Sequence, residues 1–330
     1  MSVIKEGLSW LLFILVIVSG LFVYYARSPI PLEHLPFEFS LKQGSSLKSA
    51  AHQIHLAGGL DNEWLFVLLA RGLGKATQIK PGNYQLEHDA TPLQLLNMIS
   101  KGQVEQSSLT IVEGTTFREL RIAMNADPTL RHDSQPLTDA EILKRIGASE
   151  TAAEGLFFPD TYNYASGSSD FMVLKRAYQL MQRNIQESWR QRDADLPFET
   201  PYQALILASI VEKETGQPAD RPMIASVFIN RMRKNMRLQT DPTVIYGMGD
   251  KFDGNLRKKD LERDTPYNTY TRNGLTPTPI SLPGLAAIQT VLHPAQSRAL
   301  YFVSRGDGSS QFSSTLTEHN NAVNRYQLKK

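Results

Sequence analysis

The sequence contains no cysteine, which excludes disulfide bonds and thiolate metal sites. It also lacks the HExxH pattern of zinc hydrolases, the GxSxG pattern of serine hydrolases and the glycine-rich loops that bind nucleotides. A charge excess is missing as well, because 35 Lys and Arg residues face 33 Asp and Glu residues, for a net charge of +2. Nucleic-acid binders usually carry a clear basic excess, so this balance argues against nucleic acid as a partner.

Long apolar runs are scarce, and the longest lies near the N-terminus. Leu8–Tyr25 carries no charged side chain, and as a helix it would be about 27 Å long at ~1.5 Å per residue. That length is close to the ~30 Å hydrocarbon core of a bilayer, so residues 1–30 are expected to be a short tail and a transmembrane anchor. A cleaved signal peptide is the alternative, but bulky Tyr24 stands where a cleavage site requires a small residue.

The orientation of this anchor is weakly determined by its flanking charges. Lys5 and the terminal amine lie on one side and Arg27 on the other, so the positive-inside comparison is nearly tied. A short N-terminal tail is easily left in the cytoplasm, which favours a single pass with residues 28–330 outside. No later segment of the sequence is apolar enough to span again.

The rest of the chain alternates helical and strand patterns, which predicts an α+β fold with two parts. Residues 31–105 are expected to form a small α/β module with strands at Phe37–Leu41 and near Leu86, and helices that start after Ser46, Asp61 and Thr91. Residues 106–330 are expected to form a larger, mainly helical domain with strands. Its predicted elements include strands at 107–112 and 300–304 and helices at 173–190, 202–215, 221–236 and 285–292.

The helix at 202–215 carries the strongest catalytic candidates, in the run Glu212-Lys213-Glu214. Two residues apart, these carboxylates lie roughly 200° apart around a helix and cannot share one face. Glu214 continues the apolar line that ends at Ile210 and Val211, so desolvation is expected to raise its pKa and suit it to donate a proton. Glu212 is expected to pair with Arg or Lys. The competing interpretation is that both are ordinary surface charges, the commonest state of Glu.

Polar and aromatic segments that follow this helix suit sugar recognition. Gln239-Thr240-Asp241 offers three hydrogen-bonding side chains in a row, and Tyr267–Tyr270 interleaves rings with amide and hydroxyl groups. A turn with two buried Tyr residues explains the second segment equally well. Near the end of the sequence, Glu318–Asn321 is a polar cluster whose single histidine is interpreted as a hydrogen-bonded structural group.

Four segments together resemble a known family. They are Ala208–Thr215, Val227–Arg231, Arg237–Gly247 and Tyr267–Tyr270, in this order. The sequence resembles the endolytic murein transglycosylases of bacteria, the MltG or YceG-like family, over nearly its whole length. The resemblance implies an anchor, a LysM-like module and a lysozyme-like catalytic domain, held at the bacterial inner membrane with the catalytic domain in the periplasm.

The resemblance also implies a reaction and its residues. Such enzymes cleave the bond between N-acetylmuramic acid and N-acetylglucosamine in peptidoglycan and leave 1,6-anhydromuramic ends. The family's catalytic glutamate falls on Glu214, and its substrate-binding positions fall on Thr215, Gln239, Tyr267 and Asn268, with Glu212 and Asp241 as secondary candidates. No metal or organic cofactor is expected. Expected partners are glycan strands, the cytoplasmic membrane and peptidoglycan synthases, and the expected output is control of nascent strand length.

Two other functions fit the same sequence. A muramidase that uses water needs a second carboxylate, which Asp241 or Asp264 would supply. A non-catalytic scaffold would use the LysM-like module to bind the wall and to position partner enzymes.

Overall fold

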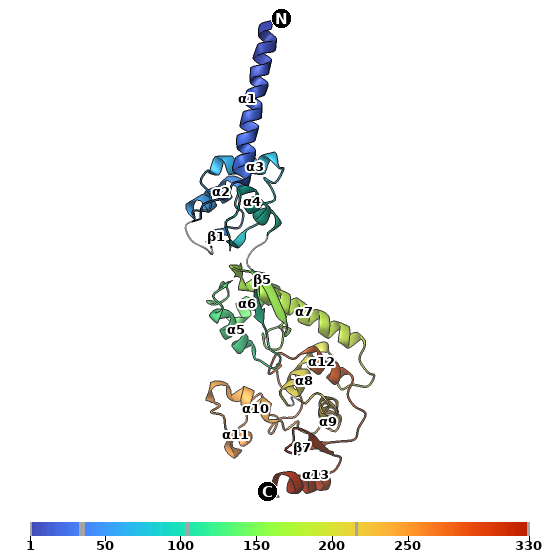
Figure 1. Ribbon diagram of the computed structural model, residues 1–330. Coiled ribbons are helices and arrows are strands. Elements are labelled where there is room, and N and C mark those ends of the chain that lie inside the picture. Colours follow the sequence, from blue (N-terminus) through green and yellow to red (C-terminus); the bar gives the residue numbers. More distant parts are fainter. Residues whose placement is uncertain (1, 33–36, 87, 103–105, 215–216, 329–330) are drawn as a thin grey trace. The chain divides into compact units, whose positions relative to one another are not determined.

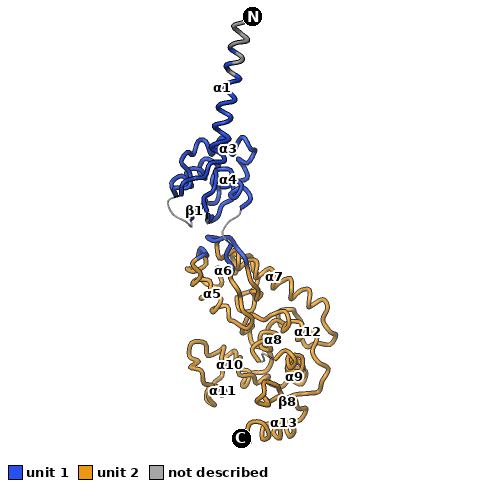
Figure 2. The backbone as a smooth tube through the Cα atoms, in the orientation of Figure 1, with its two compact units in different colours: residues 1–108, 129–131, 163–168 blue, residues 109–128, 132–162, 169–330 orange. Residues whose placement is uncertain are grey.

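The computed structural model describes residues 2–32, 37–86, 88–102, 106–214 and 217–328, and the chain forms two compact units (Figure 2). Unit 1 contains residues 1–108 with two short later segments, 129–131 and 163–168. Unit 2 contains residues 109–128, 132–162 and 169–330. These two later segments join unit 1 although the sequence places the end of the small module near residue 105.

Unit 1 is built on a strand–helix–helix–strand order. Its elements are α1 Ser2–Arg27, β1 Phe37–Leu41, α2 Leu47–Leu56, α3 Glu63–Gly72, β2 Gly82–Leu86 and α4 Pro92–Lys101 (Figure 1). β1 and β2 pair antiparallel, with Phe39 opposite Tyr84, and these two rings stack with their centroids 5.3 Å apart. The α/β architecture predicted for this module is therefore observed, whereas its likeness to LysM stays a prediction.

Local sequence signals explain where these helices begin. Ser46 caps α2, and Thr91 caps α4 in a reciprocal capping box with Gln94. The cap of α3 is Asn62, whose side chain accepts a hydrogen bond from the Leu65 N–H, rather than the predicted Asp61. Asn and Asp cap helices about equally well, so the sequence did not separate two adjacent candidates.

The long first helix ends inside the core of unit 1. Ala26 and Ile30 are buried there, and Phe22 packs against the same cluster of apolar side chains. Earlier in α1 the apolar side chains from Leu12 to Val18 are exposed. By length and hydropathy combined, none of the helices described here qualifies as a membrane span. The transmembrane anchor therefore stays a prediction.

Short paired strands and a set of helices make up the remainder of the chain. β3 Gln106–Thr110 pairs with β5 Thr161–Ala165, and β4 Leu130–Arg131 pairs with β6 Ser168–Ser169. The antiparallel hairpin near the C-terminus is β7 Tyr301–Ser304 with β8 Ser310–Ser313. The helical elements are α5 Phe117–Ala126, α6 Asp139–Ile146, α7 Asp170–Arg190, α8 Pro201–Glu214, α9 Arg221–Arg233, α10 Asp241–Met248, η1 Gly249–Lys251, α11 Lys258–Glu262, α12 Leu285–Leu292, α13 Leu316–Val323 and η2 Asn324–Leu328.

The central element of unit 2 is α8. It packs against α7, α9, α10 and α12, and every residue from Ala204 to Val211 is buried. A helix that is apolar on all sides is stable only when other elements surround it. Thr200 and Pro201 begin α8 as predicted, because the Thr200 hydroxyl accepts from the Gln203 N–H and proline suits the first helical position. Glu214 is thus carried to the end of the most enclosed helix of the domain.

Candidate active site

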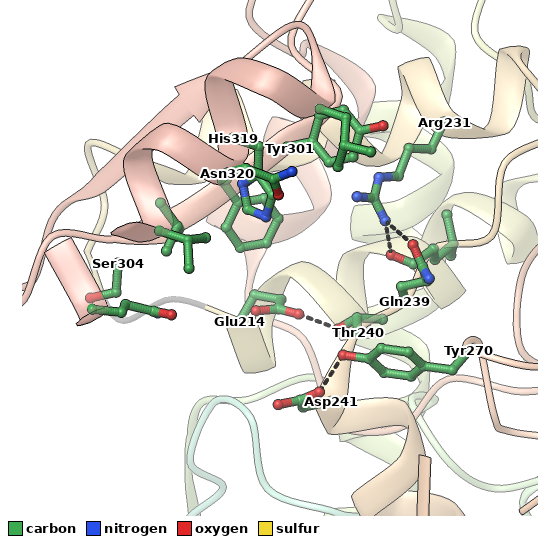
Figure 3. Close-up of a pocket in the computed structure, with 16 residues that line it drawn as sticks. Glu214, Arg231, Gln239, Thr240, Asp241, Tyr270, Tyr301, Ser304, His319 and Asn320 are labelled. Atoms are coloured by element: carbon green, nitrogen blue, oxygen red, sulfur yellow. Dashed lines mark hydrogen bonds between the residues drawn. The ribbon is translucent and has the colours of Figure 1, made fainter. Parts of the chain in front are cut away.

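Glu214 lies at the C-terminal end of α8 and lines a pocket of ≈ 680 Å³ (Figure 3). The residue keeps partial exposure, but protein atoms surround most of its carboxyl group. Oε1 accepts a hydrogen bond from the Thr240 hydroxyl. Desolvation raises the pKa of Glu214 to about 7, helped by the nearby charge of Asp241 and opposed by the Thr240 hydrogen bond and by Arg231. Near neutral pH this carboxyl is therefore protonated in a large fraction of molecules.

Glu212 faces a different part of the domain. Its Oε2 accepts from the Gly284 N–H at 3.0 Å, and its Oε1 lies 3.6 Å from the Arg221 guanidinium. Its side chain is 7% exposed, and desolvation raises its pKa while Gly284 and Arg221 oppose that rise. The predicted pairing of Glu212 with Arg or Lys is observed, and Glu212 does not line the pocket that holds Glu214.

Thr240 is fixed by a network of threonine hydroxyls. Its side chain is buried, its N–H donates to the Thr269 hydroxyl at 3.1 Å, and its carbonyl accepts from the Thr243 hydroxyl at 2.8 Å. The Thr243 and Thr269 hydroxyls are themselves 2.8 Å apart. Each polar group of this buried cluster has a partner, so the Thr240 hydroxyl has one well-defined direction, toward Glu214.

Arg231 of α9 fastens the loop that carries Gln239 and Thr240. Its guanidinium donates to the carbonyls of Arg237, Leu238 and Leu300 at 3.2, 2.7 and 2.7 Å. Gln239 adopts a positive φ of 52°, an uncommon conformation for a residue with a Cβ. Its N–H donates to the Thr269 carbonyl at 3.1 Å, and the residue lines the pocket, whereas its role as a substrate contact stays a prediction.

Asp241 follows at the start of α10 and also lines the pocket. Its carboxylate accepts a hydrogen bond from the Tyr270 hydroxyl, and desolvation together with this bond raises the pKa of Tyr270. Asp264, the other acid considered as a second carboxylate, does not line the pocket. It is exposed and pairs with Arg272 at 2.9 Å, which holds its pKa at about 2.

Two of the predicted sugar-binding residues, Tyr267 and Asn268, lie outside this pocket, and their role in substrate binding stays a prediction. Asn268 is 1% exposed, and its amide donates to the carbonyls of Leu261 and Arg263 while its oxygen accepts from the Tyr270 N–H. Tyr267 bonds the Thr278 hydroxyl and packs edge-on against Tyr246. Neither residue is among those that line this pocket, because the turn they form uses their polar groups internally.

Tyr270 is the residue of this segment that reaches the pocket. The sequence could not separate it from Tyr267, since both flank the same amide and hydroxyl pair. Thr215, the remaining predicted contact, lies outside the described residues.

A second wall of the pocket comes from β7 and α13, and the sequence analysis missed it. His319 lines it, although its polar neighbours suggested a structural histidine. Its ring stacks on Tyr301, and its buried Nδ1 has no hydrogen-bond partner. In the part of the chain that the structure describes, no group of three or more His, Asp and Glu side chains is arranged to hold a metal ion.

Comparison with known proteins agrees with the sequence motifs. Residues 39–325 match the YceG-like family. The chain is 29% identical to an endolytic murein transglycosylase of Bacillus subtilis, over 94% of this chain and 91% of that protein. It is 25% identical to an endolytic murein transglycosylase of Streptococcus pneumoniae, over 96% of this chain and 64% of that longer protein.

A solved structure is similar as well. The crystal structure of a YceG-like protein from Listeria monocytogenes aligns with a TM-score of 0.55 at 30% identity, over 86% of this chain and 98% of that one. The match along residues 39–325 spans the small module as well as the domain that carries Glu214. The chain therefore belongs to the YceG-like family.

Proposed function

We propose that this protein is an endolytic lytic transglycosylase, which cleaves the bond between N-acetylmuramic acid and N-acetylglucosamine in peptidoglycan and leaves 1,6-anhydromuramic ends. The observation that carries the proposal is the Glu214 carboxyl, which lines a pocket of ≈ 680 Å³ and has a pKa raised to about 7. A general acid works best when its pKa lies near the working pH. The relatives named endolytic murein transglycosylases support the same assignment.

The proposed reaction needs one protein carboxyl. Protonated Glu214 donates its proton to the glycosidic oxygen as the C1–O bond breaks, and the leaving sugar departs as an alcohol. The 6-hydroxyl of the muramic residue then forms the new bond to C1 and gives its proton to the Glu214 carboxylate, which restores the acid. Because the nucleophile belongs to the substrate, no water is added to the products, and no second protein carboxylate is needed.

The surroundings of Glu214 suit both halves of this cycle. Burial favours the protonated acid before cleavage, whereas the Thr240 hydroxyl stabilises the carboxylate that forms after it. Asp241 in the same pocket would oppose loss of the proton and favour the positive charge that develops at C1.

A hydrolytic muramidase is the second candidate, because Asp241 lines the same pocket and is an acid. In that mechanism Asp241 would activate water or act as the nucleophile. Mass analysis of the products from purified peptidoglycan separates the two. Lytic cleavage yields anhydromuramic ends, which are lighter than reducing ends by one water.

The Asp241→Asn variant strengthens this test. A lytic enzyme keeps its products and much of its rate in this variant, since Asp241 acts there through its charge alone and takes no part in making or breaking bonds. A hydrolase that depends on Asp241 loses about 10²–10⁴-fold in rate. Reducing ends from the wild type together with an inactive Asp241→Asn variant would replace the proposal with the muramidase.

We also propose that α1 anchors the protein in the bacterial inner membrane, with the catalytic unit in the periplasm, where it would limit the length of nascent strands beside peptidoglycan synthases. Support comes from the uncharged run Leu8–Tyr25 and from its exposed apolar side chains. Carbonate-resistant membrane association and an intact N-terminus in the mature protein are expected. A shortened mature chain would instead indicate a cleaved signal peptide.

A further inference from the structure

The proposed reaction leaves one wall of the pocket without a role. This α13 wall consists of Tyr301 from β7 and His319 and Asn320 from α13. Figure 3 shows His319 and Tyr301 on the other side of Glu214 from Asp241 and Tyr270. A substrate that places a glycosidic oxygen at Glu214 must therefore extend past the α13 wall or past the Asp241 side.

The part of the α13 wall that α13 itself contributes belongs to a helix face that remains partly open. The pocket-lining residues of α13 are Leu316, His319, Asn320 and Val323, spaced at three and four residues. This is the periodicity of a face that a helix normally buries against its own domain. Here Leu316 stays 56% exposed and Asn320 is exposed, whereas Ala322, two residues after Asn320, is buried. On this face His319 packs against Tyr301, whereas Leu316 and Asn320 beside it stay open to a ligand.

Aromatic stacking fixes the surface of the wall. The Tyr301 and His319 rings stack with centroids 5.2 Å apart and planes inclined by 22°, and the Arg231 guanidinium lies 5.2 Å from the Tyr301 centroid. Arg231 is itself held by three backbone carbonyls, so the stack rests on a rigid base. Flat rings held in this way suit the apolar C–H face of a pyranose.

His319 and Asn320 add neutral hydrogen-bonding groups. Burial and the nearby Arg231 charge lower the pKa of His319, so its imidazole is uncharged at neutral pH. Its Nδ1 is buried without a hydrogen-bond partner, so the protein leaves part of the hydrogen-bonding capacity of this imidazole unused. The exposed amide of Asn320 offers both a donor and an acceptor. An acetamido group presents the complementary pair, one N–H and one C=O.

The charges of the pocket select against an acidic ligand. Of the described residues that line it, Arg231 is the single Lys or Arg, and backbone carbonyls already bind its guanidinium. The Asp241 carboxylate in the same pocket would repel an acidic ligand. A sugar that carries a lactyl carboxylate or an acidic peptide is therefore disfavoured at this wall.

We infer that the α13 wall binds an uncharged N-acetylhexosamine of the glycan strand, in the position next to the bond that Glu214 cleaves. This inference rests on the proposed function for the identity of the strand. It assigns the His319 ring, supported from behind by Tyr301, to the face of the sugar ring and Asn320 to the acetamido group.

The test combines cleavage with binding. Initial rates are measured for His319→Ala and Asn320→Ala on glycan strands with stem peptides and on strands from which an amidase has removed them. Asn321→Ala is the matched control, since Asn321 is an exposed neighbour that does not line this pocket. We expect KM to rise about tenfold in the two wall variants on both substrates, with kcat changed by less than about threefold. Asn321→Ala should match the wild type.

Binding of chitotetraose to the Glu214→Gln protein, followed by calorimetry, separates this inference from the proposed function. His319→Ala or Asn320→Ala in that background should weaken the Kd about tenfold, and Asn321→Ala should not. A protein that fails to cleave peptidoglycan but binds chitotetraose through His319 would refute the proposed function and keep the subsite. Normal cleavage with unchanged KM in both wall variants would refute the subsite. A KM increase confined to peptide-bearing strands would assign the wall to the stem peptide instead.

Discussion

Glu212 and Glu214 lie two residues apart on α8, and their carboxyl groups accept hydrogen bonds from separate parts of the domain. Glu212 accepts from the Gly284 N–H and lies 3.6 Å from Arg221, whereas Glu214 accepts from the Thr240 hydroxyl and lines the pocket. Desolvation raises both pKa values, so exposure alone does not distinguish them. The two carboxyl groups differ in their surroundings: Glu212 lies beside the Arg221 guanidinium, whereas Glu214 accepts from the Thr240 hydroxyl and faces the pocket.

The first prediction contrasts the two Gln variants. Glu212→Gln removes the charge beside the largely buried Arg221 guanidinium, and loss of one partner of a buried ion pair costs about 3 kcal/mol of folding free energy. Its products and its kcat/KM below the unfolding temperature should match the wild type. Glu214→Gln should keep or increase the stability, because it removes a desolvated acid, while kcat falls about 10²–10⁴-fold.

Urea unfolding and product analysis on the same preparations check this contrast. The opposite pattern, an inactive Glu212→Gln and an active Glu214→Gln, would transfer the acid role to Glu212.

The sequence predicted most elements of the fold because their signals are local. Thr91-Pro92 and Thr200-Pro201 mark helix starts in the sequence, and α4 and α8 begin there. Glu214 was also identifiable, through its motif and its position on α8. The Thr240 bond and the α13 wall were not, since they join residues distant in sequence: Thr240 and Glu214 are separated by α9, and His319 and Tyr301 by the β7–β8 hairpin. Spacing along the chain carries no signal for such contacts.

The second prediction concerns the pH dependence of cleavage. Glu214 must be protonated to act, and its pKa is raised to about 7, so kcat/KM should be constant below about pH 6 and fall tenfold per pH unit above about pH 8. Asp241→Asn removes a charge that raises this pKa and should move the fall in rate to lower pH. Thr240→Val removes a bond that lowers it and should move the fall to higher pH.

Rate profiles from pH 5 to 9 at one ionic strength measure these shifts, with Glu212→Gln as the control that keeps the wild-type profile. Shifts in the same direction for Asp241→Asn and Thr240→Val would contradict this account of Glu214.

The third prediction is that Arg231 supports catalysis through the loop of Thr240. Arg231→Lys keeps the charge but not the planar guanidinium, so most of its bonds to Arg237, Leu238 and Leu300 are lost. We expect a loss of about 3–6 kcal/mol in the free energy of unfolding if two of the three bonds are lost, given ~1.5–3 kcal/mol per hydrogen bond to a charged group. We also expect a lower kcat, because Thr240 is less firmly placed. Urea unfolding and initial rates measure these two effects. If the stability and kcat of Arg231→Lys equal those of the wild type, the loop of Thr240 keeps its conformation without the guanidinium bonds.

The last prediction concerns Glu154, a buried acid outside the pocket. Its oxygens accept from the Phe117 N–H at 2.9 Å and the Tyr246 hydroxyl at 3.1 Å, and burial raises its pKa to about 7. The folded state therefore holds this proton more tightly than the unfolded chain, whose Glu titrates near 4.5. The contribution of protonated Glu154 to the free energy of unfolding is therefore complete below about pH 4.5 and is lost as the pH rises to about 7. At 1.36 kcal/mol per pKa unit, this contribution is on the order of 3 kcal/mol.

Glu154→Gln keeps the Phe117 contact through its amide oxygen, can donate from its amide N–H to the Tyr246 hydroxyl oxygen, and cannot ionise, so it should remove this part of the pH dependence. Its free energy of unfolding at pH 8 should exceed that of the wild type, while the two should be similar at pH 4.5. Glu214 titrates in the same range, so the comparison is made in the Glu214→Gln background, where Glu154 is the acid under test. A Glu154→Gln protein that is less stable than its parent at pH 8 would show that the carboxylate, and not the acid, is the form that the fold prefers.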